Sequence, residues 1–497
     1  MQTSPHKALR KNLILASLVT TMALAAMDNY VVSTAIPQIV GDLGSFSLFT
    51  WLFTIYLLIQ TITIPLYGKL SDLVGRKPII IFGIIAFLIG SALCGAAWNM
   101  LSLIVFRGLQ AIGAGAILAT VNTIAGDIYT IQERAKIQGW LSSVWGISAV
   151  IGPAIGGFFA EYMTWRWIFF INIPFGIISI ILIVKYLHEP KPSKKPSIDW
   201  LGAIFMLITG TLLMYILLQS GQSWPWLSYT TFILSTILLL LFILVLKIER
   251  KAKEPIMPGW IWQRRVLIGA NLGIIGMGMV MIGPNMYIPV FAQYVLGVGA
   301  ISAGFILTSM SFTWPLSSGL SGFFYLRIGF RNTALIGTVL VLIGSIGFLF
   351  IQFPGNIVGL VSVQMLMGAG FGLIATPLLV GVQSTVGYEQ RGVVTGTNMF
   401  GRYFGQSLGS AILAVVFNNQ IEHKLAQAPA SLQNQLPQVN EIVDAMKGSG
   451  NNPALLNFLR EAFFEATHWV YVGTSIILVL TILILLWTPK KFPIVED

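Results

Sequence analysis

The stretch GKLSDLVGRKP (Gly68–Pro78) is a charged segment set between two long apolar runs. Charged residues make up only 9% of the chain, yet four of these eleven positions are ionisable: Lys69, Asp72, Arg76 and Lys77. We interpret the segment as a short turn between antiparallel helices, in which Asp72 accepts hydrogen bonds from Arg76 or from the N-terminus of a neighbouring helix. A purely basic topology anchor would explain Arg76 and Lys77 but not Asp72. An ion-paired turn of this kind can hold one conformation and release it in another.

The composition indicates an integral membrane protein. Of the 497 residues, 56% are hydrophobic, and the mean hydropathy is +0.81, far from the values of soluble domains. Apolar runs of about 20 residues recur, each long enough to cross a hydrocarbon core of about 30 Å as a helix. A membrane β-barrel is excluded, because its strands would alternate in polarity. The expected fold is therefore all-α.

We predict fourteen transmembrane helices and a division into three parts. The spans are 13–37, 48–68, 79–98, 100–127, 138–162, 165–187, 199–219, 228–248, 266–293, 301–325, 332–351, 357–385, 393–417 and 468–488. Residues 1–187 form a six-helix bundle, 188–265 a linker with two additional helices, and 266–497 a second six-helix bundle. A long extracellular loop, 418–467, with room for short amphipathic helices, lies within the second bundle.

The net charge of +11 reflects membrane topology. Lys and Arg concentrate before the first span, in Gly68–Pro78, and within 185–195 and 247–265. This positive-inside asymmetry predicts cytoplasmic termini and contact with anionic lipid, and it makes nucleic acid a remote alternative. The single cysteine, Cys94, lies in an apolar run, so no disulfide framework is expected.

Two pairs of segments indicate an internal repeat. Ile131–Trp140, after the fourth span, and Gly387–Gly396, after the twelfth, both place a Glu and an Arg before a glycine-rich helix. Ser321–Asn332 aligns with Tyr67–Pro78, but Leu326 stands where the first copy has an acid. Two halves in parallel repeat, with two helices inserted between them, fit this pattern.

The charged segment resembles the signature G-x-L-(S/A)-D-x-x-G-R-(K/R) of the major facilitator superfamily. In that family it acts as a latch between the two halves on the cytoplasmic side. The resemblance extends over essentially the whole chain and implies alternating access between two helical bundles. It assigns the gating role to the matching positions Gly68, Asp72, Gly75, Arg76 and Lys77. From their places near the ends of the fourth and fifth spans, we expect Asp127 and Arg134 to help this latch.

Two further stretches resemble exporters of this superfamily. GISAVIGPAIGGFF (Gly146–Phe159) is similar to the antiporter signature, although ordinary glycine-mediated helix packing is the alternative. AAMDNYVVSTAIPQI (Ala25–Ile39) is similar to the first helix of the fourteen-helix drug:proton antiporter branch, but Tyr30 and Ser33 depart from its polar positions. The antiporter signature assigns five residues of the fifth span: Gly146, Gly152, Pro153, Gly156 and Gly157.

Titratable groups at membrane depth are the candidates for proton coupling, because a charge in hydrocarbon is costly unless it faces a cavity or a partner. Asp28 lies about sixteen residues, or ~24 Å, into the first span. The alternative is an acid held only by helix-end or hydroxyl donors. Arg107 begins a near match to the family's R-x-x-Q-G motif, with snorkelling outward as the alternative. Glu161 is a candidate second proton site, whereas Arg402 is expected to be solvated or paired near a span end.

The predicted function is export of small amphipathic, cationic drugs or dyes in exchange for protons, by a monomer in the bacterial cell membrane without a cofactor. Export of an endogenous lipid, siderophore or metabolite is the alternative. An enzyme is disfavoured, because no metal cluster or nucleophile–base pair is seen. No GxxxxGK[ST] segment for nucleotide binding is present. Polar and aromatic residues expected to face the substrate cavity are Asn29, Tyr30, Tyr56, Gln60, Gln110, Asn122, Met281, Asn285, Trp314 and Asn398. For each of them, ordinary helix packing is the alternative.

Overall fold

The structure is a computed structural model, and it describes residues 5–44, 48, 51–189, 199–220, 224–438, 442, 445–446 and 452–495. Within these ranges the chain is helical, without a named strand. Each predicted span falls on a helix. The first eight helices are α1 Pro5–Thr34, α2 Ile36–Leu43, α3 Trp51–Val74, α4 Arg76–Gly95, α5 Met100–Ile128, α6 Ile131–Tyr162, α7 Trp167–Phe170 and α8 Asn172–Tyr186.

The remaining helices include the inserted pair and the second half. The pair is α9 Trp200–Gln219 and α10 Tyr229–Lys251. The second half contains α11 Arg265–Val290, which continues as a π-helix over Phe291–Val295, then α12 Ala300–Ile328, α13 Phe330–Leu349, α14 Ile357–Ser384, α15 Arg391–Ala426 and α17 Pro453–Trp487. Short 3₁₀ turns occupy Gly259–Trp262, Tyr388–Gln390 and Gln433–Gln435.

Twelve helices of the described chain are long and apolar enough to cross a membrane. The helices α12 and α15, which contain two further predicted spans, are also long, at 29 and 36 residues, but they are less apolar than these twelve. A helix that is shielded from lipid by its neighbours tolerates more polar residues. Arg391 of α15 and Tyr325 of α12 lie at the contact between the two halves, as described below.

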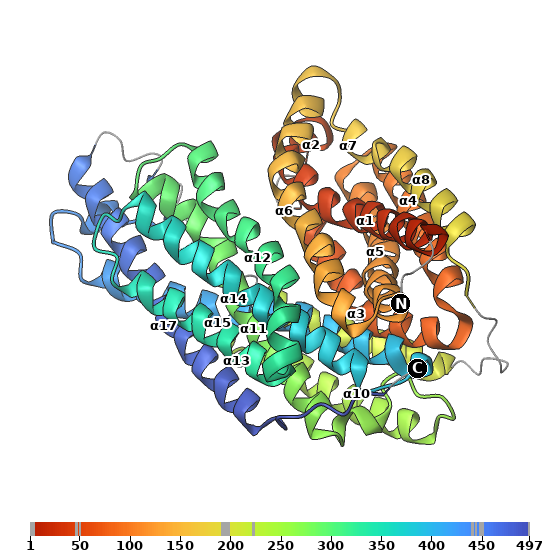
Figure 1. The fold of residues 1–497 in the computed structure, drawn as a ribbon. Coiled ribbons are helices and arrows are strands. Elements are labelled where there is room, and N and C mark those ends of the chain that lie inside the picture. The colour runs from red at the N-terminus through yellow and green to blue at the C-terminus, as the bar shows by residue number, and fades with distance from the viewer. Residues whose placement is uncertain are drawn as a thin grey trace.

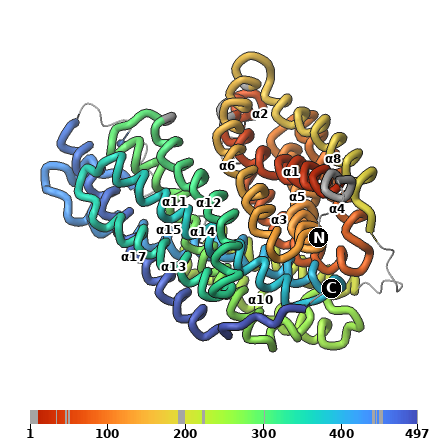
Figure 2. The backbone as a smooth tube through the Cα atoms, in the orientation of Figure 1, coloured from red at the N-terminus to blue at the C-terminus, as the bar shows by residue number. Residues whose placement is uncertain are grey.

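The helices form two bundles. In Figure 1 the elements α1 to α8, coloured red to yellow, make one bundle, and α11 to α17, coloured green to blue, make the other. The bundles meet in the lower centre of this view and lie apart toward its top. Contacts between them run mainly from α3 to α15 and from α6 to α12. The tube in Figure 2 shows α10 below both bundles; none of its residues is buried, while α9 packs against α3 and α15.

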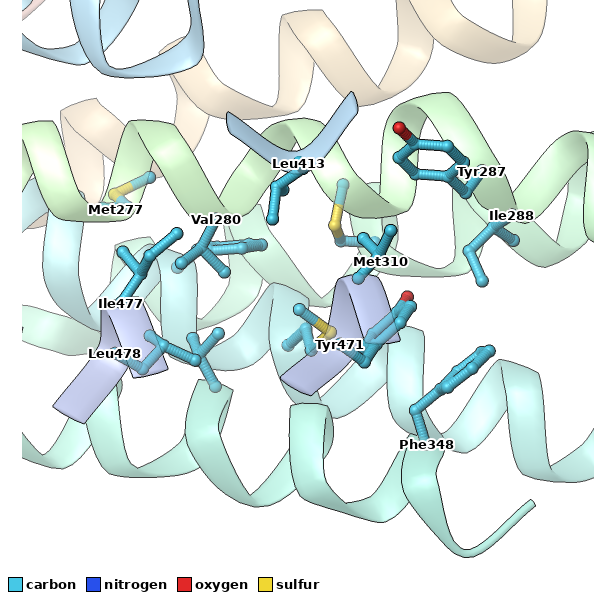
Figure 3. Close-up of a cluster of buried hydrophobic side chains, with 14 of the residues drawn as sticks. Met277, Val280, Tyr287, Ile288, Met310, Phe348, Leu413, Tyr471, Ile477 and Leu478 are labelled. Carbon is cyan, nitrogen blue, oxygen red and sulfur yellow. The ribbon is translucent and has the colours of Figure 1, made fainter. Parts of the chain in front are cut away.

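Each bundle has its own apolar core. In the second bundle, buried side chains from α11, α12, α13, α15 and α17 gather in one cluster (Figure 3). Phe348 and Tyr471 stack there with ring centroids 3.9 Å apart. In the first bundle the core is rich in small residues of α5, including Ala111, Ala114 and Ala116. Small side chains allow transmembrane helices to approach closely, since van der Waals contact is a main source of stability in lipid.

The charged segment Gly68–Pro78 is mostly helical, so the prediction of a turn over its full length was wrong. α3 continues through Val74 and α4 begins at Arg76, which leaves one residue, Gly75, between them. Gly75 has φ +107°, a conformation that other residues rarely adopt. Gly329, its counterpart in the repeat, separates α12 from α13 with φ +87°. A single glycine therefore reverses the chain in both halves.

The loop expected at 418–467 is shorter than predicted. α15 continues to Ala426 and α17 begins at Pro453. Lys424 on α15 forms ion pairs with Glu461 and Glu465 on α17, at 3.4 and 2.6 Å. Opposite charges on facing helices support helical extensions beyond the apolar spans. The polar composition led us to expect a loop, although it also suits helices outside the membrane.

We call the end where the bundles meet the closed end. It contains Gly75, Gly329 and the first turns of α6 and α15, as the contacts below show. Both ends of the described chain lie near it. The hydroxyl of Tyr129 donates to the carbonyl oxygen of Lys11 at 2.7 Å, and the backbone nitrogen of Val495 donates to the carbonyl oxygen of Ser384 at 2.8 Å.

Candidate functional site: the closed end and the central cavity

Asp72 ties the first bundle to the second at the closed end. Its carboxylate accepts hydrogen bonds from the backbone nitrogens of Gly392 and Val393, each at 2.8 Å, in the first turn of α15. It also pairs with Arg76 at 2.9 Å, and its side chain is only 2% exposed. A carboxylate at a helix N-terminus is favoured by the free N–H groups and by the helix dipole. Both partners expected for Asp72 are thus present.

Asp127 is the second bridging acid. It pairs with Arg76 at 2.9 Å within the first bundle and with Arg391 of α15 at 2.7 Å across the interface. Together with Asp72, the group contains two acids and two arginines, all nearly buried. Buried ions are tolerated when each is paired and hydrogen-bonded, and loss of one partner leaves a costly unpaired charge. The closed end therefore depends on the complete group.

Glu189 and Tyr388 complete this group, and the sequence analysis missed both. The Glu189 carboxylate accepts from the backbone nitrogens of Arg76 and Lys77, at 2.7 and 2.9 Å, and so caps α4. The hydroxyl of Tyr388 donates to Glu189, and the guanidinium of Arg76 lies 3.8 Å from the centre of the Tyr388 ring. Burial, together with the hydrogen bond to Glu189, raises the pKa of Tyr388 above its ordinary value. The sequence offered one signal for Glu189, namely an acid inside the otherwise basic stretch HEPKPSKKPSI.

The contact between α6 and α12 is formed without an ion pair among the described residues. The hydroxyl of Tyr325 donates to the carbonyl oxygen of Ile131 in the first turn of α6. Further along, Gly139 faces Gly319: a β-carbon on Gly139 would lie 2.9 Å from the Cα of Gly319. This contact is the counterpart, in the repeat, of the contact between α3 and α15.

Two residues expected in the gate bond to carbonyl groups within the first bundle. Lys77 donates to the carbonyl oxygens of Val184 and Leu187, each at 2.8 Å, at the end of α8. Arg134 donates to the carbonyl oxygen of Tyr129 at 2.9 Å and to that of Gly126. Both cations satisfy carbonyl groups that the ends of α8 and α5 leave free.

The glycines of the antiporter signature have different surroundings along α6, which contains Pro153 in its interior. A β-carbon on Gly146 would lie 2.7 Å from the carbonyl oxygen of Ser311, on α12 of the other bundle. One on Gly152 would lie 2.7 Å from the β-carbon of Tyr30 on α1. Gly156 is buried, whereas a β-carbon on Gly157 would meet nothing within 4 Å. Close packing thus explains Gly146 and Gly152 but not Gly157.

Asp28 and Arg107 form an ion pair inside the first bundle, and both side chains are fully buried. Gln110 joins them: its amide nitrogen donates to Asp28 at 2.8 Å, and its carbonyl oxygen accepts from Arg107 at 2.8 Å. The guanidinium of Arg107 also lies 4.2 Å from the centre of the Tyr56 ring. The two residues expected to handle protons are therefore in contact. Glu161, the third candidate, is exposed at the end of α6 and lies outside this network.

A small central cavity lies between the bundles, just beyond the contacts of the closed end. Its volume is about 50 Å³, far below the several hundred Å³ that a drug-sized ligand occupies. Three of the predicted cavity residues line it, namely Asn122, Trp314 and Asn398. Side chains that the sequence analysis did not place there also line it, including Gln138, Trp145, Arg402 and Tyr403. Arg402 was expected near a span end, and that expectation was wrong.

The other predicted cavity residues are absent from the lining of this cavity. Tyr56 and Gln110 belong to the network around Asp28, and Gln60 is buried in the first bundle. Asn29 and Asn285 each donate to the carbonyl oxygen four residues earlier, those of Ala25 and Met281. Tyr30 packs against Gly152, and Met281 contacts Arg402. The sequence shows which residues of a span are polar, but it does not show which surface of the bundle each of them faces.

Comparison with known proteins agrees with this architecture. The family description "Major Facilitator Superfamily" matches residues 18–203 and 197–410. The chain belongs to the major facilitator superfamily. It is therefore a multi-pass membrane transporter, not an enzyme.

Curated relatives of this transporter align with most of its length. Multidrug resistance protein 3 of Bacillus subtilis (strain 168) is 34% identical over 498 residues, which are 99% of this chain and 97% of the relative. Multidrug transporter protein MdtP of the same organism is 33% identical over 443 residues, 89% of this chain and 82% of the relative. Efflux pump FUS6 of Gibberella moniliformis is 30% identical over 84% of this chain and 76% of the relative.

Solved structures share the major facilitator fold with this chain at low identity. The human organic anion transporter MFSD10 (TETRAN) has a TM-score of 0.61 at 12% identity, covering 95% of this chain and 99% of that one. A bacterial homolog of the human lysosomal transporter Spinster, in an inward-facing and unoccupied conformation, has a TM-score of 0.57 at 15% identity, covering 98% of each chain. At such identities the similarity concerns the fold alone.

Proposed function

We propose that this protein is a multidrug exporter that exchanges small amphipathic compounds for protons by alternating access. The observation that carries the proposal is the buried pair of Asp28 and Arg107, with Gln110 bonded to both. The names of the two Bacillus subtilis relatives support multidrug transport. The exchange of protons is inferred from the chemistry of the buried pair.

A proton on Asp28 would break this pair. When ionised, Asp28 balances the charge of Arg107 in a fully buried position. Protonation would leave Arg107 as an uncompensated buried cation, a state that costs several kcal/mol. A rearrangement of the helices that exposes Arg107 to solvent, or that brings another partner to it, would remove this cost. Binding of a proton would thereby favour a different arrangement of the helices, which is what coupling requires.

The closed end faces the cytoplasm in this proposal, and the opposite end faces outward. Support comes from the basic residues near the closed end, among them Arg10, Lys11, Lys77 and Arg331, since cytoplasmic segments carry an excess of Lys and Arg. The conformation is then closed toward the cytoplasm, and the protein sits as a monomer in a cell membrane with both termini inside.

The aromatic lining of the central cavity bears on the class of substrate. Trp145, Trp314 and Tyr403 line the cavity, and such rings attract amphipathic cations through their π faces. Cationic dyes are therefore the first compounds to test. Export of an endogenous lipid, siderophore or metabolite is the second candidate, because the same rings and the methionines Met22 and Met399 would accept such apolar groups.

The test is proton release by the purified protein. Addition of ethidium to the wild type in weakly buffered detergent solution should release protons, and the Asp28→Asn variant should release none. In proteoliposomes, Asp28→Asn should reduce ethidium transport driven by a pH gradient by about tenfold or more. Asp42→Asn is the matched control, since Asp42 pairs with Arg166 at the molecular surface, and it should behave as wild type. Full gradient-driven transport by Asp28→Asn would overturn the role of Asp28.

A further inference from the structure

Arg402 is a cation within the membrane that faces the central cavity. It lies eleven residues after the start of α15, or about 16 Å along the helix. It is one of the residues that line the cavity between the bundles. A charged side chain at this depth is costly, and it marks a functional site when it faces a cavity.

The contacts of Arg402 leave its charge without compensation. Its Nε atom is buried and has no hydrogen-bond acceptor among the described residues. Its Nη2 atom makes a weak contact with the sulfur of Met281 at 3.9 Å. The ring of Trp314 lies 5.0 Å from the guanidinium, and that of Tyr403 lies 5.9 Å away. Aromatic faces and a thioether attract a cation only modestly.

The cavity also provides no acid to neutralise Arg402. Among the described residues that line it there is no Asp or Glu. Its amide side chains are engaged with other amides: Gln138 donates to Asn122 at 3.2 Å, and Asn398 donates to Asn271 at 3.4 Å. Asp28 is held by Arg107 and Gln110 inside the first bundle.

We propose that Arg402 binds the carboxylate of an acidic or zwitterionic aromatic substrate. This inference rests on the proposed drug export. It changes the expected substrate class from cationic to acidic or zwitterionic compounds, because Arg402 lines the same cavity without an acid among the described lining residues. The planar guanidinium presents paired N–H groups that match the two oxygens of a carboxylate. Trp314 and Tyr403, which flank the guanidinium, provide the surface for the aromatic part of the ligand. The bundles must separate further before such a ligand fits, because the cavity has a volume of only about 50 Å³.

The experiment uses three probes that share a naphthoxy group and carry an anionic, a neutral or a cationic end group: 2-naphthoxyacetate, 2-(2-naphthoxy)ethanol and 2-(2-naphthoxy)ethyl-trimethylammonium. Binding of each to the full-length protein in detergent is measured by isothermal titration calorimetry. The wild type should bind the carboxylate at least tenfold more tightly than the alcohol. Arg402→Gln should remove this preference and leave the affinity for the alcohol within about twofold, while Arg402→Lys should retain part of it. Arg166→Gln, at a surface ion pair, should preserve the wild-type order.

Three results would overturn the assignment. The first is equal binding of the carboxylate and the alcohol by wild-type protein. The second is tightest binding of the ammonium probe. The third is an equal loss of affinity for all three probes in an Arg402→Gln variant that thermal unfolding shows to be folded. Arg402 would then only support the structure. Binding is measured without a gradient, so a negative result here leaves proton-driven export intact, and absence of export leaves the carboxylate preference intact.

Discussion

The two contacts that join the bundles occupy equivalent places in the repeat but differ in chemistry. Between α3 and α15, Asp72 and Asp127 bond to Arg76, Arg391 and the first turn of α15 in a buried ionic group. Between α12 and α6, the hydroxyl of Tyr325 makes a single bond to a carbonyl oxygen. The position of Asp72 is occupied in the second copy by Leu326, which is half exposed.

This difference assigns different tasks to the two contacts. Separating α3 from α15 would uncover paired charges and leave backbone N–H groups without an acceptor, so it has a high free-energy cost unless water or another partner enters. Between α12 and α6, the polar contact described above is one neutral hydrogen bond among the described residues. We therefore expect the ionic contact to contribute more than the neutral contact to the stability of the closed end. Three pairs of substitutions test whether the two contacts contribute differently to the closed form.

One measurement serves all three pairs. Spin labels are placed on cysteines at Lys136 and Glu389, exposed positions on the first and second bundle near the closed end. The distance distribution between them reports the fractions of closed and open molecules. Cys94 is buried and free, so it should react little with the label.

The largest effect is expected from a glycine pair. A β-carbon on Gly392 would meet the carbonyl oxygen of Gly68 and lie 2.7 Å from Oδ1 of Asp72, which forces α3 and α15 apart. A β-carbon on Gly319 would meet nothing closer than 3.9 Å. Gly392→Ala should shift the equilibrium toward the open form by about 3 kcal/mol, roughly 100-fold, while Gly319→Ala should leave it unchanged. Equal effects of the two variants would show that the contacts are equally tight.

The second pair compares Asp72 with its counterpart. Asp72→Asn removes the charge that the first turn of α15 and Arg76 share, and should favour opening by about 2 kcal/mol, roughly 30-fold. Leu326→Asn, at the equivalent exposed position, should change the distance distribution little. Turnover should slow in Asp72→Asn with ligand affinity largely preserved. If Asp72→Asn shows wild-type distances and wild-type transport, then Asp72 does not stabilise the closed form and the segment serves only to set membrane topology.

The smallest effect is expected from the neutral contact. Tyr325→Phe removes one hydroxyl but keeps the ring stacked on Phe330, whose centroid is 4.9 Å away. The closed form should lose about 1 kcal/mol, roughly a fivefold shift. Ser71→Ala is the matched control, because Ser71 occupies the equivalent place and donates only to Gly68 of its own helix. A shift in Tyr325→Phe as large as in Asp72→Asn would contradict the division between ionic and neutral contacts.

The candidate site could be predicted in part. Asp72, Asp127, Asp28 and Arg107 were identified because charges are rare in an apolar chain and must be paired. The partners were harder to find, since Gly392 and Glu189 contribute through a helix N-terminus and a linker that only the packed bundles bring close. Arg402 was misjudged for a related reason. Its position along the helix is evident, but the surface it faces depends on how the bundles dock.

The sequence by itself determined that the protein is a helical membrane protein and predicted fourteen spans, because hydrophobic length and the placement of basic residues are local properties that lipid selects directly. It also located a chain reversal within Gly68–Pro78. Only the tertiary structure decided that most of Gly68–Pro78 is helix, that Asp72 reaches the first turn of α15, and that Arg402 faces the cavity without an acid. Those features depend on contacts between residues hundreds of positions apart, which the local pattern of polarity does not encode.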